Sequence, residues 1–198
     1  MFVTQGVKAV RMDDIAQELS ISKRTLYEMF GDKEELLYQS IRLFVTEGQQ
    51  RRMEQCRLID NCLESMLLSL RDMILHAPEA ARIRRNLKRF YPTVHSRLEE
   101  DAMVNSKNDL RRWINDCINK GYMTTTADSE FVIRVLHDSV QGMMVAEQND
   151  TRDSVEIISL MTYAIVIFIR GLCTANGIEV IDRCFDKYFG NISPREAL

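Results

Sequence analysis

Apolar side chains recur at helical spacing along almost the whole chain, and no stretch alternates convincingly in the way that a half-buried strand does. Turn signals such as Gly31, Pro78 and Gly121 separate the periodic stretches. The pattern predicts an all-α protein with helices over residues 12–19, 22–30, 33–53, 58–76, 78–90, 93–120, 128–148, 153–174 and 178–188.

Two short amphipathic helices near the N-terminus meet at a tight corner. Residues 12–19 carry one apolar face and residues 22–30 carry another, while residues 19–22 form the corner. Helices this short are not stable alone, so both must pack on a third element. The spacing is the helix-turn-helix pattern, in which the second helix enters the major groove of DNA by its N-terminal end. A solvated helical hairpin has the same spacing, so both interpretations stay open at this point.

The front of the second short helix is polar. Ser22 is a suitable N-cap, and Lys23, Arg24, Thr25 and Tyr27 are expected to point outward, where they can reach base edges or phosphates. The helix N-terminus itself favours an anion. We therefore interpret the polar front as a surface for DNA.

The next helix begins with a second group of charged residues. Asp32 and Glu35 have the spacing of a capping box. Lys33 and the free backbone amides at this helix start can hold a further phosphate.

The stretch FVTQGVKAVRMDDIAQELSISKRTLYEMFGDKEELL resembles the DNA-binding module of the TetR family of transcriptional regulators (TetR/AcrR type). The resemblance covers residues 2 to about 41, roughly a fifth of the chain. It rests on Phe2, Gly6, Ile15, Ala16, residues 22–27, Phe30 and residues 33–37.

The resemblance implies a one-component regulator, with a helix-turn-helix DNA-binding domain at residues 1–45 and a helical regulatory and dimerisation domain at residues 46–198. It implies that Lys23, Arg24 and Thr25 face the operator and that Tyr27 and Lys33 contact phosphate. The DNA-binding residues that it implies are Arg11, Met12, Ser22, Lys23, Arg24, Thr25, Tyr27 and Lys33.

The sequence departs from the family pattern at three places. Ser20 and Arg24 stand where glycine is common, and Arg24 adds a long donor to the reading surface. A full helix normally precedes the motif, whereas only residues 1–5 stand in its place here. We therefore expect Ile15, Leu26 and Phe30 to be partly open to water, which predicts a loosened DNA-binding domain and a missing N-terminal segment.

The predicted helix over residues 153–174 is apolar nearly all round, which favours cover by a partner chain. The predicted helix over residues 128–148 has an apolar stripe with small residues that permit close approach. Together they predict a homodimer through a four-helix bundle. A central helix buried within one subunit is the alternative.

Composition narrows the function further. The net charge of −3 means that any contact with DNA depends on a local patch. Five cysteines without a CxxC pair indicate reduced thiols. No signal peptide is recognisable, and the longest apolar stretch, residues 157–169, is too short to span a bilayer, so we expect a soluble, cytoplasmic protein without a membrane partner.

The ligand site is the least specified part of the sequence. Aromatic, histidine and methionine side chains at helical spacing either line a pocket for an unidentified small-molecule effector or form plain core. The candidate pocket residues are Phe90, Tyr91, His95, Trp113, His137 and Met144. His95 and Glu99 are spaced as a metal pair, but no second pair accompanies them, so neither a metal nor a cofactor is expected.

No enzyme motif accompanies these features: there is no glycine loop for phosphate and no nucleophile motif. We therefore predict a non-enzymatic, ligand-responsive transcriptional regulator. The resemblance implies a dimeric repressor that a small molecule releases from a double-stranded DNA operator. The alternative is a helical interaction module without DNA binding.

Overall fold

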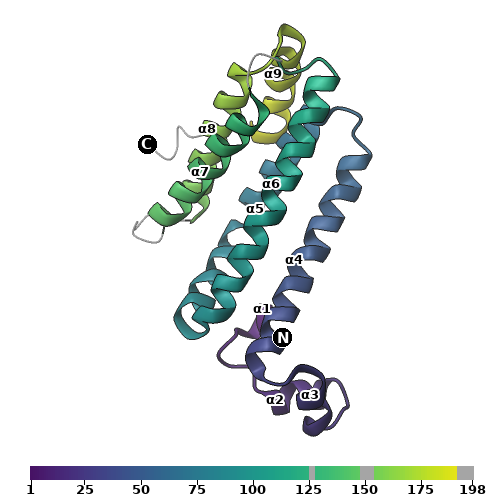
Figure 1. Ribbon diagram of the computed structural model, residues 1–198, viewed down its shortest axis with the longest axis vertical. Helices are drawn as coiled ribbons and strands as arrows, with labels where there is room; N and C mark the ends of the chain where they lie inside the picture. Colours follow the sequence, from purple (N-terminus) through teal and green to yellow (C-terminus); the bar gives the residue numbers. More distant parts are fainter. Residues whose placement is uncertain (125–127, 148–153, 191–198) are drawn as a thin grey trace. The chain divides into compact units, whose positions relative to one another are not determined.

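The computed structural model describes residues 1–124, 128–147 and 154–190, and for helical residues 140–147, 154, 155 and 158 only the backbone. Within these ranges the regular secondary structure is helical, apart from one isolated β-bridge between Met123 and Cys173, which confirms the predicted all-α class (Figure 1). The helices are α1 Phe2–Gln5, α2 Met12–Glu18, α3 Lys23–Phe30, α4 Lys33–Arg57, α5 Cys62–Phe90, α6 Pro92–Asn119, α7 Ser129–Glu147, α8 Ser154–Gly171 and α9 Ala175–Phe189.

The break predicted at Pro78 is wrong, because residues 62–90 form one continuous helix, α5, with Pro78 inside it. Proline removes one backbone donor and crowds the preceding turn, which costs roughly 3 kcal/mol in an isolated helix. Ile74, Ala77 and Ala81 are all buried on either side of it. Burial on both sides of the proline therefore outweighs the local preference for a break.

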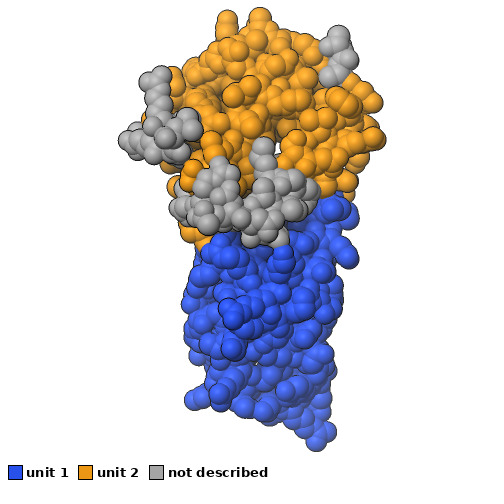
Figure 2. All heavy atoms as spheres, turned by 90° about the vertical axis from the view of Figure 1, so that its left-hand side faces the viewer, with its two compact units in different colours: residues 1–53, 79–104 blue, residues 54–78, 105–198 orange. Residues whose placement is uncertain are grey.

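The described chain forms two compact units (Figure 2). Unit 1 comprises residues 1–53 and 79–104, and unit 2 comprises residues 54–78 and 105–198. Helices α4, α5 and α6 each supply residues to both units. The functional division predicted between residues 45 and 46 remains a prediction.

The core of unit 1 contains side chains from α1 to α6. Ile15 is 7% exposed and Leu26 is fully buried, so the expectation that both would be open to water is wrong; Phe30 packs partly buried against the same core. Side chains from the N-terminal segment and from the α5–α6 corner cover this core in place of the full helix that normally precedes the motif. The core residues are Phe2, Val7, Val10, Met12, Ile15, Ala16, Leu26, Leu36, Leu37, Tyr38, Ile41, Leu87 and Val94.

Unit 2 has its own core, to which α5 to α9 contribute. Gly177 lies so close to the backbone of Tyr122 that an added Cβ would be 2.2 Å from its carbonyl oxygen. The Thr174 amide donates to the same carbonyl at 3.0 Å, and the Thr174 hydroxyl caps α9. This close approach attaches the start of α9 to the loop that follows α6.

Candidate nucleic-acid interface

The corner between α2 and α3 has the geometry that the sequence predicts. Figure 1 shows the two short helices side by side near the N-terminal end of the ribbon. Ser20 adopts a positive φ of 53°, which costs a non-glycine residue about 1 kcal/mol. The Ile21 amide donates to the Ala16 carbonyl at 3.0 Å, and Ala16 is buried where the helices cross. The corner is therefore closed by backbone hydrogen bonding and by a small side chain.

Ser22 caps α3 as predicted. Its hydroxyl accepts a hydrogen bond from the Thr25 amide at 3.0 Å and lies 2.8 Å from the Thr25 hydroxyl. The cap leaves the other amides of the first turn, together with the positive end of the helix, facing the polar front. The first turn of α3 therefore has the chemistry of an anion-binding surface.

Lys23, Arg24 and Tyr27 are exposed on α3, as the sequence predicts. The Lys23 ammonium pairs with Asp13 of α2 at 2.8 Å, and Arg24 pairs with Glu28 at 2.8 Å. The hydrogen bond from Lys23 to Asp13 raises the pKa of Lys23 above its ordinary value, so the side chain stays cationic. Exposed ion pairs contribute little to stability, so both cations can exchange these partners for DNA at small cost.

The two residues implied at the start of α2 lie in different surroundings. Arg11 is the exposed N-cap residue of α2, and its amide donates to the Asp14 carboxylate at 2.8 Å. Met12 is 5% exposed and packs in the core of unit 1. The Met12 side chain is therefore directed inward, whereas Arg11 lies on the surface.

The start of α4 has one of the two hydrogen bonds of the predicted capping box. The Asp32 carboxylate accepts from the Glu35 amide at 2.8 Å. The Glu35 carboxylate turns away from the cap and pairs with Arg97 of α6 at 2.7 Å. Lys33 lies over the ring of Tyr91, with its Nζ 5.3 Å from the ring centroid. The half-buried Lys33 side chain is thereby held beside the helix start.

A polar network inside unit 1 joins α4 to α6, and the sequence analysis did not predict this network. The Tyr38 hydroxyl donates to Asp101 at 2.7 Å, and the Arg97 guanidinium stacks 3.7 Å from the Tyr38 ring centroid. Arg97 lowers the pKa of Glu35, and its own pKa is raised in return. Tyr38 and Asp101 are 63 residues apart, and no local pattern signals such a pair.

The predicted pocket residues divide between the units. Phe90, Tyr91 and His95 belong to unit 1, where His95 is buried with its Nε2 3.3 Å from Glu99. Trp113 and His137 belong to unit 2, and the side chain of Met144 lies outside the described residues. The pocket therefore remains a prediction.

Two further observations concern the described part of the chain. Over those residues, no group of three His, Cys, Asp or Glu side chains is placed to hold a metal ion. No helix there is long and apolar enough to cross a bilayer.

A capped corner of two short helices, with an exposed cationic front and an all-helical remainder, defines a protein with the helix-turn-helix DNA-binding fold. Residues 1–39 match the family model described as "Bacterial regulatory proteins, tetR family". The N-terminal part of the chain is thus similar to the TetR family, and the chain as a whole has the fold of TetR-family transcriptional regulators.

Similarity to solved structures supports the fold assignment. A TetR-family transcriptional regulator from Pectobacterium atrosepticum is 21% identical, with a TM-score of 0.66 over 87% of this chain and 88% of its own. One from Rhodococcus is 17% identical, with a TM-score of 0.61 over 85% and 92%. A transcriptional regulator from Saccharomonospora viridis, solved in complex with choline, is 19% identical, with a TM-score of 0.61 over 87% of this chain and 92% of its own. No curated protein matches the chain in sequence.

Proposed function

We propose that this protein is a dimeric DNA-binding transcriptional repressor that a small molecule releases from its operator. The observation that carries the proposal is the exposed, cationic first turn of α3, which is held outward by the Ser22 cap. In the proposed complex α3 enters the major groove, and Lys23 and Arg24 exchange Asp13 and Glu28 for DNA.

The flanking contacts hold the backbone of the operator. Lys33 binds a phosphate at the start of α4, where the helix N-terminus adds to its charge. Tyr27 and Arg11 are exposed near the same corner and bind phosphates on either side of it. These contacts fix the register of α3, whereas Arg24 and Thr25 read base edges.

Exposed apolar side chains support the dimer. Phe131 of α7 is 60% exposed and Ile167 of α8 is 70% exposed, although Val166 and Ile169 beside Ile167 are buried. A helix with a buried face and a large apolar side chain on its other face fits cover by a second copy. We propose that α7 and α8 of two copies form a bundle with two-fold symmetry. In this dimer, two copies of α3 contact successive major-groove faces of a near-palindromic DNA site. We propose that the protein acts in the cytoplasm.

The regulatory ligand is proposed to be a small organic molecule. The similar regulator from Saccharomonospora viridis holds choline, which supports the view that this fold accommodates such a ligand. A ligand that binds one spacing of the two α3 helices better than the other lowers operator affinity by its differential binding alone. The hinge of this change is proposed to run through α4.

A gel-shift titration with the DNA that flanks the protein's own gene tests the proposal. We expect a saturable shift that is lost in the double variant Lys23→Ala with Tyr27→Ala. Arg112→Ala is the matched control, because Arg112 is also exposed and paired with an acidic residue on its own helix, in unit 2. Undiminished binding by the double variant would show that α3 does not face DNA, and absence of any shift would favour a helical interaction module.

A further inference from the structure

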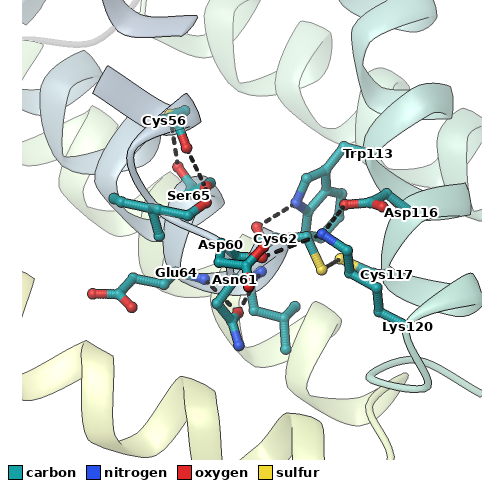
Figure 3. A network of polar contacts seen from close by, with 12 residues as sticks. Cys56, Asp60, Asn61, Cys62, Glu64, Ser65, Trp113, Asp116, Cys117 and Lys120 are labelled. Carbon is teal, nitrogen blue, oxygen red and sulfur yellow. Dashed lines mark hydrogen bonds and ion pairs between the residues drawn. The ribbon is translucent and has the colours of Figure 1, made fainter. Parts of the chain in front are cut away.

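Cys62 and Cys117 meet in the core of unit 2 (Figure 3). Cys62 is the first residue of α5, and Cys117 lies in the last turn of α6. The two Sγ atoms are 2.6 Å apart, about half an ångström more than the roughly 2.05 Å of a disulfide bond. Both residues are buried, and all five cysteines of the chain are free thiols. The two sulfur atoms are therefore already placed as bonding partners.

Polar contacts hold the two helix ends in this arrangement. The indole N–H of Trp113 donates to the Cys62 carbonyl at 2.7 Å. Asn61 caps α5 by accepting from the amides of residues 63 and 64 at 3.0 and 3.1 Å. Lys120 donates to the Asp60 carbonyl at 3.2 Å and pairs with Asp116 at 3.1 Å. Figure 3 shows these contacts surrounding the cysteine pair.

The two thiols are chemically unequal. The hydrogen bond that Cys117 donates lowers the pKa of Cys62, and this effect outweighs burial and the nearby Asp116 carboxylate, which both raise it. The same hydrogen bond, together with burial, raises the pKa of Cys117. The N-terminal position of Cys62 on a long helix also favours its thiolate. Cys62 therefore has the character of an attacking sulfur, and Cys117 that of the thiol that resolves the product.

The cysteine pair lies close in sequence to an exposed loop. The pair adjoins the loop before α5, in which Leu58 is 89% exposed and Asp60 is also exposed. Both cysteines are buried, so oxidation requires a local opening at this helix end. Cys184, by contrast, is buried among residues of α9 and has no cysteine partner among the contacts described.

The geometry points to Cys62 and Cys117 as a reversible dithiol site that small hydroperoxides oxidise to a disulfide. The Cys62 thiolate attacks one peroxide oxygen and becomes a sulfenic acid, while the O–O bond breaks and hydroxide leaves. The Cys117 thiol then attacks the Cys62 sulfur, the S–S bond forms, and the sulfenic hydroxyl leaves as water with the Cys117 proton. The proton that Cys62 released on forming its thiolate neutralises the hydroxide from the first step. In sum, two thiols and one hydrogen peroxide give one disulfide and two waters.

The test uses the full chain, which is reduced, freed of reductant and treated with hydrogen peroxide. Mass spectrometry after maleimide labelling of the urea-unfolded chain is expected to count five thiols before oxidation and three after it, since two of the five enter the bond. Digestion without reductant is expected to yield one peptide that links residues 62 and 117. Dithiothreitol is expected to restore five thiols.

Trp113 provides an independent readout, because it is the only tryptophan in the chain and contacts the Cys62 carbonyl. Its fluorescence is expected to fall on oxidation and to recover on reduction. Cys117→Ser and Cys117→Ala are each expected to abolish the change and to accumulate Cys62 sulfenic acid, which a dimedone probe labels. Cys184→Ser is the matched control and is expected to behave as the wild type.

Three results would overturn the proposal: five thiols that survive peroxide in the unmodified chain, a linkage that involves another cysteine, or a fluorescence change that persists without Cys117. The first two are measured on the unmodified protein, so they do not depend on the folding of any variant. Circular dichroism on the two Cys117 variants separates loss of the thiol from loss of the fold.

Discussion

The Tyr38 hydroxyl of α4 donates a 2.7 Å hydrogen bond to the Asp101 carboxylate of α6. Arg97 stacks on the same tyrosine ring and pairs with Glu35, so one guanidinium contacts both residues of α4. Since only two residues separate the end of α3 at Phe30 from the start of α4, this network fixes against α6 the helix that directly follows the candidate recognition helix. Within unit 1, the corner of α2 and α3 is thus connected to α6 through Tyr38 and Glu35.

Removing the Tyr38 hydroxyl is expected to destabilise unit 1. In Tyr38→Phe the ring remains to carry Arg97, whereas Asp101 loses the Tyr38 hydroxyl and keeps the 3.6 Å contact with Arg42. Loss of a hydrogen bond to a carboxylate typically costs about 1–2 kcal/mol, which urea unfolding followed by circular dichroism resolves. Tyr27→Phe is the control, because Tyr27 is exposed and should change stability by less than about 0.5 kcal/mol. Equal losses of unfolding free energy in Tyr38→Phe and Tyr27→Phe would show that the Tyr38 hydroxyl stabilises unit 1 no more than an exposed hydroxyl does.

The Lys33→Ala variant tests whether the start of α4 contacts phosphate. If Lys33 binds one phosphate in each half-site, the dimer loses two such contacts. The slope of log affinity against log salt concentration should then become shallower by about 1.8, since each phosphate contributes about 0.9. Fluorescence anisotropy with operator DNA at several salt concentrations measures this slope. Arg112→Ala should leave it unchanged; a Lys33→Ala slope equal to that of the wild type would place Lys33 away from the backbone.

Asp13→Asn is expected to tighten binding to DNA. Asp13 holds the Lys23 ammonium at 2.8 Å and places a negative charge beside the proposed phosphate path. Removing the Asp13 charge frees Lys23 and ends the repulsion between Asp13 and the DNA phosphates. The affinity for operator DNA should therefore rise about twofold or more at low salt. The same anisotropy titration measures it, with Asp109→Asn in unit 2 as the control. Weaker binding would show instead that Asp13 positions Lys23 for the contact.

The helix-turn-helix corner was predictable because its determinants are local. The Ser22 cap, the strained Ser20 and the small Ala16 each act within a few residues, and the structure has all three as the sequence indicates. The core that supports the corner was not predictable in this way. Leu87 and Val94 reach it from α5 and α6, and a one-dimensional pattern does not show such distant partners.

The same limit explains the errors and omissions elsewhere. Pro78 locally favours a break, but burial of the residues on both sides keeps α5 continuous. The cysteine spacing likewise gave no sign that Cys62 and Cys117 would meet, because 55 residues separate them. Contacts between distant segments are set by packing, whereas caps and corners are set by neighbours.

Glu64 should make the protein lose stability in acid. Lys187 and then Tyr188 donate to its carboxylate at 2.8 and 2.9 Å, and these hydrogen bonds lower the pKa of Glu64 below its ordinary value near 4.5. A carboxyl whose pKa is lower in the folded state stabilises the protein above its unfolded-state pKa, and this contribution disappears as the pH falls through the folded-state pKa. The stability of the wild type over Glu64→Gln should therefore be largest near pH 7 and shrink below about pH 4.5. Urea unfolding of both proteins at a series of pH values measures the difference, with Glu54→Gln, at an exposed position of α4, as the control. A difference between wild type and Glu64→Gln that stays constant across this range would show that Glu64 is not held as a carboxylate by Lys187.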